Sequence, residues 1–368
     1  MATHGTLDTI GGITAPPIPP ATDEAVDASR PAIPRRRRAL KALAGVVVAA
    51  VAGWLVVSTA GGVGDAIDAV GRMRAGFVLV ALGFAIVRMI LFGLQQLWLG
   101  RRTGPLTVRT AMALSLVIFG FGAITPAAPA EGLAIAGREL RHRGRTAGEA
   151  RLTMGFSEWF AQRTFYGIAA LDLFVVIALG HLTLSDSWPF ALVAVVVLIA
   201  LAGSAMAART PASAIWIARI LTRLRYRRPQ PSADERRQAA GDWHARAMAL
   251  VGPPRNRARL AGVSALAVLA DAGTLWATCH AAGFHVHPEL VLLARTVGTV
   301  VSWVPLLPGG LGLVEAAIPT VLHHFGAPLD DALAATLVYR AAGTLLPAIA
   351  GGIAIITMRT RRRTRLSG

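Results

Sequence analysis

A cluster of helix-breaking residues and one carboxylate stands inside a long apolar stretch, between Pro305 and Glu315. Its members are Pro305, Pro308, Gly309, Gly310, Gly312 and Glu315. Proline lacks the backbone N–H and glycine costs backbone entropy, so a helix cannot continue here. Broken backbone at membrane depth survives only where protein covers it or where it lines a cavity. A broken helix followed by a charge is the pattern of a substrate site in a transporter.

A second Pro-x-x-Pro motif, at Pro126 and Pro129, precedes another carboxylate, Glu131. Arg163 follows Pro129 by 34 residues, and Arg340 follows Pro308 by 32. This layout predicts an inverted-topology repeat in which each broken segment is followed by a helix with a buried arginine. A coincidence of proline positions is the alternative.

Nine ionisable residues lie within the apolar segments: Arg88, Glu131, Glu158, Arg163, Asp172, Asp271, Arg295, Glu315 and Arg340. Each costs about 2.5–3.5 kcal/mol at the centre of a membrane helix, so we expect partners or a wet cavity. The simplest pairing joins each acid after a tip with the arginine that follows. The pairs would either bind substrate or only hold the structure together. Asp172 and Asp271 are the weaker candidates.

The predicted substrate-binding set contains both Pro-x-x-Pro motifs, the three glycines, and the charged residues Glu131, Glu158, Arg163, Arg295, Glu315 and Arg340. Arg295 suits a lipid phosphate, because a guanidinium group binds phosphate bidentately. It could equally snorkel to the outer headgroups. We expect no catalytic group, no metal and no cofactor.

The composition indicates an all-α polytopic membrane protein. The 368 residues are 54% hydrophobic with a mean hydropathy of +0.55, and Cys279 is the single cysteine, so an internal disulfide is excluded. We predict about six full transmembrane helices, near 42–60, 76–99, 153–180, 188–208, 259–281 and 332–357. The broken segments 110–137 and 290–325 complete the membrane part.

Arginine positions predict the orientation. Of the 37 Lys and Arg residues, 30 fall in 35–41, 100–109, 138–151, 209–259 and 359–365. The positive-inside rule places these segments in the cytoplasm, with both termini, at the plasma membrane. Segment 110–137 then enters and leaves from the cytoplasm and segment 290–325 from outside. Both are therefore predicted to be re-entrant hairpins.

The predicted organisation is a disordered basic tail (1–38), a membrane domain (39–358) and a basic tail (359–368), both tails cytoplasmic. Within the domain, the loop 209–258 has the pattern of basic amphipathic helices. The formal charge of +17 is interpreted as topology and contact with the anionic inner leaflet, not as nucleic-acid binding. The sequence leaves the oligomeric state open.

The stretch from Pro305 to Glu315, the run Leu337-Val338-Tyr339-Arg340 and the segment Thr125 to Gly132 resemble the lysylphosphatidylglycerol synthase transmembrane (flippase-like) family. The resemblance covers about residues 40–358. It implies an α-helical fold with two re-entrant hairpins and a role in moving or handling lipids. Relatives fuse this region to an aminoacyl-transfer domain, which the ten residues after 358 cannot form, so we expect a stand-alone flippase-like domain without lysyl transfer.

Four functions are weighed, and the last of them receives the least support. The first is translocation or handling of a lipid, either an anionic phospholipid or a lipid-linked precursor, driven without a nucleotide-binding loop because the G-x-x-x-x-G-K-[ST] motif is absent. The second is an ion-coupled transporter of a small anionic solute, with Glu158, Asp271 and Glu315 as coupling groups. The third is a non-catalytic scaffold of the cell envelope. A membrane-embedded enzyme ranks last.

Overall fold

The computed structural model describes residues 68–124, 129–182, 188–209, 245, 249–250, 252–302, 310 and 312–366. Within these ranges the chain forms helices and short connections, without a strand. All of them belong to one compact unit. The expected fold class, all-α, is therefore confirmed for the described part of the chain.

Among the described residues, five helices are long and apolar enough to cross a membrane. They are α4 (Ala75–Arg102), α7 (Ala147–Ala178), α8 (Trp188–Arg209), α11 (Pro254–Ala281) and a composite of α14 (Leu329–Arg340), the π-helical turn η2 (Ala341–Leu345) and α15 (Leu346–Leu366). These correspond to five predicted spans. The remaining predicted span, 42–60, lies outside the described residues. The predicted single helix at 332–357 instead contains the π-helical turn, which adds residues to one turn of the helix.

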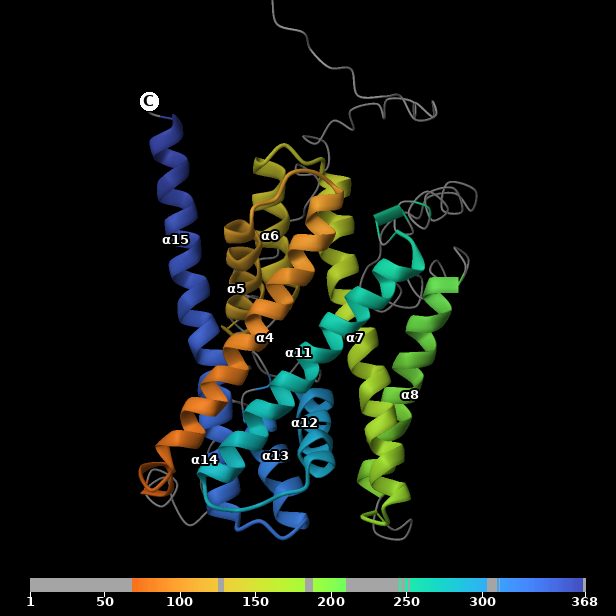
Figure 1. Ribbon diagram of the computed structural model, residues 1–368, viewed down its shortest axis with the longest axis vertical. Coiled ribbons are helices and arrows are strands. Elements are labelled where there is room, and N and C mark those ends of the chain that lie inside the picture. The colour runs from red at the N-terminus through yellow and green to blue at the C-terminus, as the bar shows by residue number, and fades with distance from the viewer. Residues whose placement is uncertain are drawn as a thin grey trace, which may run out of the picture. The chain divides into compact units, whose positions relative to one another are not determined.

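Four shorter helices occupy the two broken segments. They are α5 (Val108–Ile124), α6 (Pro129–His142), α12 (Pro288–Ser302) and α13 (Leu313–His324). Each has 17 residues or fewer, so none is longer than about 26 Å and none reaches the ~30 Å of a hydrocarbon core. Figure 1 shows the α5–α6 pair and the α12–α13 pair at opposite ends of the bundle.

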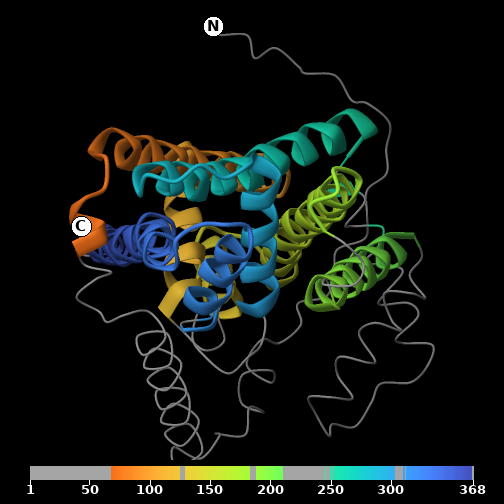
Figure 2. The same ribbon diagram turned by 90° about the horizontal axis from the view of Figure 1, so that it is seen from below.

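The central contact of the unit is between α4 and α11, which share more neighbouring residues than any other helix pair. They run side by side in both views (Figures 1 and 2). The short pairs pack across the unit: α5 packs against α15, and α12 packs against α7. Glycine permits the first of these contacts, because a Cβ at Gly120 would lie 2.8 Å from the carbonyl oxygen of Pro347.

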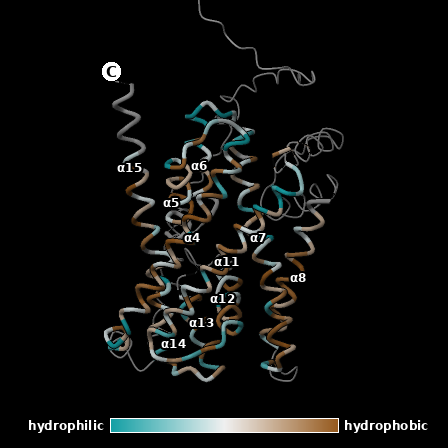
Figure 3. The backbone as a smooth tube through the Cα atoms, viewed as in Figure 1, coloured by the Kyte–Doolittle hydropathy of each residue, from teal (hydrophilic) through white to brown (hydrophobic). Residues whose placement is uncertain are grey.

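Apolar side chains fill the bundle and also cover its outside. One core cluster combines Leu275, Leu293, Ile318 and Leu322 from α11, α12 and α13. On α7 and α8, in contrast, Phe174 is 68% exposed and Ile199 is 66% exposed. Figure 3 shows hydrophobic colour along most of α8. Exposed apolar surface on this scale fits helices that face lipid.

Candidate functional site

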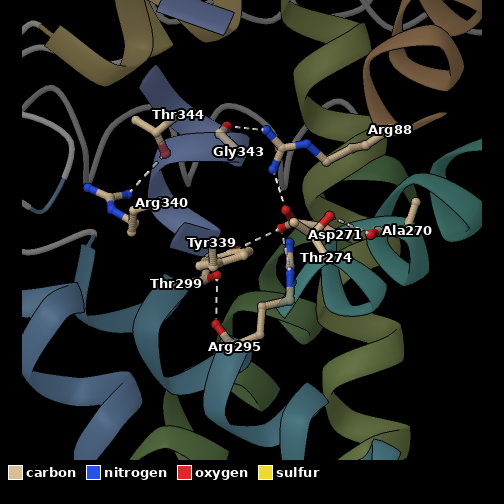
Figure 4. A network of polar contacts seen from close by, with 10 residues as sticks. All are labelled: Arg88, Ala270, Asp271, Thr274, Arg295, Thr299, Tyr339, Arg340, Gly343 and Thr344. Carbon is tan, nitrogen blue, oxygen red and sulfur yellow. Dashed lines mark hydrogen bonds and ion pairs between the residues drawn. The ribbon is translucent and has the colours of Figure 1, made fainter. Parts of the chain in front are cut away.

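Asp271 is the centre of a polar cluster in the interior of the bundle. It lies in the middle of α11, and its side chain is only 7% exposed. The carboxylate accepts hydrogen bonds from Arg88 on α4, from Arg295 on α12 and from the Tyr339 hydroxyl on α14 (Figure 4). Four helices, two of which (α11 and α12) are consecutive in the chain, therefore meet at one buried anion, and a charge inside the bundle needs such partners.

Arg88 joins this anion to the π-helical turn. One Nη of its guanidinium group donates to Asp271 Oδ1, and the other donates to the Gly343 carbonyl oxygen at 2.6 Å. The guanidinium carbon also lies 4.9 Å from the centre of the Phe119 ring of α5, a cation–π contact. Arg88 thus contacts α11, η2 and one of the short helices at the same time.

Arg295 approaches the same carboxylate from α12. Its Nε donates to Asp271 Oδ2 at 2.7 Å, and its guanidinium carbon lies 4.9 Å from the Phe165 ring centre on α7. The side chain is only 11% exposed. The alternative that Arg295 snorkels to outer headgroups is therefore wrong, because its charge is held inside by Asp271.

The cluster carries more positive than negative charge. Two guanidinium groups share the single carboxylate of Asp271, whereas Tyr339 contributes a neutral hydroxyl. Buried Arg295 Nη1 and Arg88 Nε have no hydrogen-bond partner within the described ranges. A buried donor without an acceptor costs about 1–3 kcal/mol, more when it is charged. The arrangement can therefore accept an additional anionic oxygen at low cost.

A second ion pair forms beside the cluster. Arg340 Nε donates to Glu315 Oε1 at 2.8 Å, and Oε2 of the same carboxylate accepts the Gly312 backbone N–H at 2.7 Å. Gly312 has φ +81°, a conformation that glycine adopts readily, and it is the N-cap residue immediately before α13. The predicted pairing of the acid after a tip with the following arginine is confirmed for Glu315 and Arg340.

The other predicted site residues are not joined to this cluster by any described contact. Glu158 accepts a hydrogen bond from Gln162 on the same helix, and Arg163 lies over the Trp159 ring. Gly310 has φ +67° and marks the turn into α13. Pro126, Pro305, Pro308 and Gly309 lie outside the described residues, as do the side chains of Pro129 and Glu131. The predicted pair of Glu131 with Arg163 stays a prediction.

Three members of the cluster were absent from the predicted set: Arg88, Asp271 and Tyr339. Arg88 and Asp271 were recognisable as charges within apolar runs, but their separation of 183 residues hides the pairing. Tyr339 directly precedes Arg340, and its neutral hydroxyl does not stand out in an apolar run as a charged residue does. On one α-helix adjacent residues point about 100° apart, so Tyr339 and Arg340 reach different carboxylates.

Comparison with known proteins identifies one family. The family model described as lysylphosphatidylglycerol synthase TM region matches residues 42–351. That range includes every residue of the cluster around Asp271 and the pair of Glu315 with Arg340. A search of curated proteins finds no match.

Proposed function

Because the chain belongs to the family of the lysylphosphatidylglycerol synthase transmembrane region, which connects it with phospholipid handling, we propose that it moves anionic phospholipids or lipid-linked precursors across the plasma membrane. The observation that carries the proposal is the excess positive charge around Asp271. A lipid phosphate supplies the anionic oxygen that Arg295 Nη1 lacks. No covalent step is part of the proposed process.

The short helix pairs suggest how a headgroup reaches this charge. We propose that α5–α6 and α12–α13 are re-entrant hairpins that enter from opposite faces of the membrane, with the arginine-rich segments and both termini in the cytoplasm. Their placement at opposite ends in Figure 1 supports this topology. In this topology neither hairpin spans the bilayer as a full helix. A polar headgroup can therefore enter the membrane interior beside a hairpin tip while its acyl chains remain in lipid.

The reciprocal packing of the halves supports an inverted repeat. The first hairpin packs against α15, the last helix of the second half, and the second hairpin packs against α7, the last helix of the first half. The proposed repeats are α4 to α7 and α11 to α15. One repeat can rock against the other so that the cluster opens first to one leaflet and then to the other. With no nucleotide-binding loop in the sequence, the driving force would be a gradient, a partner pathway or the lipid concentration difference.

An ion-coupled transporter of a small anionic solute receives less support. Two of its three candidate coupling carboxylates, Asp271 and Glu315, already accept hydrogen bonds from guanidinium groups. Only Glu158 among the three has no described cation, and its oxygen accepts from the neutral Gln162 amide. A carboxylate bound to arginine is less available to carry a coupling ion.

The proposal is tested by reconstitution into vesicles that contain phosphatidylglycerol with a fluorophore on one acyl chain. A membrane-impermeant reductant bleaches the outer leaflet only, so about half of the signal survives without lipid movement. Wild-type protein is expected to expose nearly all of it. After the fast bleaching of the outer leaflet, a second phase reports lipid that the protein brings there from the inner leaflet. Arg295→Gln should slow this second phase by about tenfold, because one charged hydrogen bond is worth about 1.5–3 kcal/mol.

Arg138→Gln is the matched control, because this exposed arginine lies on α6 away from the cluster. It should transport at the wild-type rate. Equal slowing in both variants would show that overall charge matters and not the site. Wild-type vesicles that behave like protein-free vesicles for phosphatidylglycerol and for a polyprenyl-phosphate lipid would refute lipid movement altogether.

A further inference from the structure

A cavity of about 310 Å³ lies away from the cluster, between the last turns of α4 and the first turns of α11. This volume is at the lower end of the range for small-molecule sites. The nearest cluster residue on each helix is at least ten positions away along the chain: Arg88 on α4 and Asp271 on α11. The cavity is therefore a separate feature of the fold.

Each helix lines the cavity with a triplet at positions i, i+3 and i+4, which share one helix face. Helix α4 contributes Trp98, Arg101 and Arg102, and helix α11 contributes Asn256, Arg259 and Leu260 in the same spacing; Leu99 of α4 completes the lining. Leu260 is 4% exposed, whereas the three arginines are exposed. The cavity thus has an apolar base, an aromatic side chain and a cationic opening.

The three positive charges face one another without compensation. Over the described ranges, no Asp or Glu lines the cavity and none of the three arginines takes part in an ion pair. Guanidinium groups that converge on one space repel one another unless an anion joins them. A positive-inside bias explains arginines near this end of the helices but not their convergence from segments about 150 residues apart.

Two of the arginines also contact neighbouring parts of the chain, and Arg101 is oriented by a hydrogen bond. Arg101 Nε donates to the Leu106 carbonyl oxygen at 3.1 Å, which leaves its two terminal nitrogens for another acceptor. The guanidinium group of Arg102 lies against Gly252, where an added Cβ would stand 2.5 Å from Nη1. Donors that are already oriented lose less side-chain entropy when they bind.

We propose that this cavity is a binding site for the phosphate of an anionic phospholipid in the cytoplasmic leaflet. The guanidinium groups would hold the phosphate, the Asn256 amide would donate to the headgroup, and Trp98 with Leu260 would contact the glycerol and first acyl carbons. The apolar part of the lining favours a lipid over free inorganic phosphate, which has no group to place there. The site stands whether or not the cluster around Asp271 transports lipid.

Native mass spectrometry of the protein released from neutral detergent tests the proposal with phosphatidylglycerol, phosphatidylcholine and inorganic phosphate as separate probes. Wild-type protein should retain phosphatidylglycerol most tightly. In Arg102→Gln/Arg259→Gln the number of tightly bound phosphatidylglycerol molecules should fall by one, with about tenfold weaker binding of that molecule. Saturation by inorganic phosphate at the same concentration as the lipid would overturn the lipid assignment.

The matched control is Arg109→Gln/Arg138→Gln, which removes the same charge from exposed positions outside the cavity. It should bind phosphatidylglycerol like the wild type, and equal weakening in both double variants would overturn the site. Asn256→Asp keeps all three arginines and places a carboxylate in the cavity, so it should also lose the bound lipid. None of these cavity variants changes the cluster around Asp271, so their loss of the bound lipid is separate from the transport proposal.

Discussion

Arg88 on α4 and Asp271 on α11 form an ion pair between the first helices of the two proposed repeats. They are 183 residues apart, whereas Pro126 and Pro305 are 179 apart. The difference of four residues is about one helical turn, so under the proposed repeat the two charges would occupy matching helix faces one turn apart. The opposite charges attract each other inside the bundle. An ion pair of this kind ties the relative position of α4 and α11 to the charge state of the site.

Asp271→Asn should be the most destabilising single charge removal in the cluster. It leaves Arg88 and Arg295 facing each other without an anion in the interior. Loss of one partner of a buried pair typically costs about 3–5 kcal/mol. The measurement is thermal unfolding in detergent. Asp68→Asn, at an exposed position, is the control and should unfold like the wild type.

The losses of stability caused by removing Arg88 and Arg295 should be non-additive. In Arg88→Gln, Asp271 keeps the bond from Arg295 Nε, and in Arg295→Gln it keeps the bond from Arg88. Only the double variant leaves the buried carboxylate without a cation, so its loss of stability should exceed the sum of the single losses by about 0.5–3 kcal/mol. Unfolding of all four proteins closes the thermodynamic cycle. Strict additivity would mean that Asp271 does not couple the two arginines.

Hydropathy and charge position could predict much of this fold. Apolar length predicted five spanning helices that the structure contains, and proline and glycine placed the breaks between α5 and α6 and between α12 and α13. The pair of Glu315 and Arg340 was predictable because both residues belong to consecutive elements of one half. Local periodicity and short-range order carry this kind of information.

The centre of the site required the tertiary structure. Asp271 meets Arg88 only because α4 packs along α11, and a helical pattern contains no signal for which partner a helix chooses. The sequence left open whether Arg295 meets a lipid phosphate or snorkels to the outer headgroups, and only the tertiary structure shows that α12 directs it into the bundle. The π-helical turn that receives Arg88 at Gly343 was not predicted either, because the apolar pattern indicated one continuous helix over 332–357.

Glu315 should show two separable effects. Its carboxylate pairs with Arg340 and also accepts the Gly312 N–H at the start of α13. Glu315→Gln loses the charge but keeps an acceptor for the N–H, whereas Glu315→Ala loses both. We expect stability to fall in the order wild type, Gln, Ala, with about 0.5–2 kcal/mol between the last two for the lost helix cap. Equal unfolding temperatures for Gln and Ala would show that the cap contributes nothing.

Adjacent glycines in α15 should respond in opposite ways to the same substitution. A Cβ at Gly351 would collide with the Leu116 carbonyl oxygen of α5, whereas a Cβ at Gly352 would meet nothing within 4 Å. Gly351→Ala should therefore push α5 from α15 and lower the unfolding temperature, and it should slow lipid movement if the α5–α6 hairpin must stay seated. Gly352→Ala should be neutral or stabilise the protein by up to about 1 kcal/mol, because alanine is the better helix former. Because both variants add one methyl group to the same helix, a loss of stability in both would show that helix propensity or insertion, and not the α5–α15 contact, limits this segment.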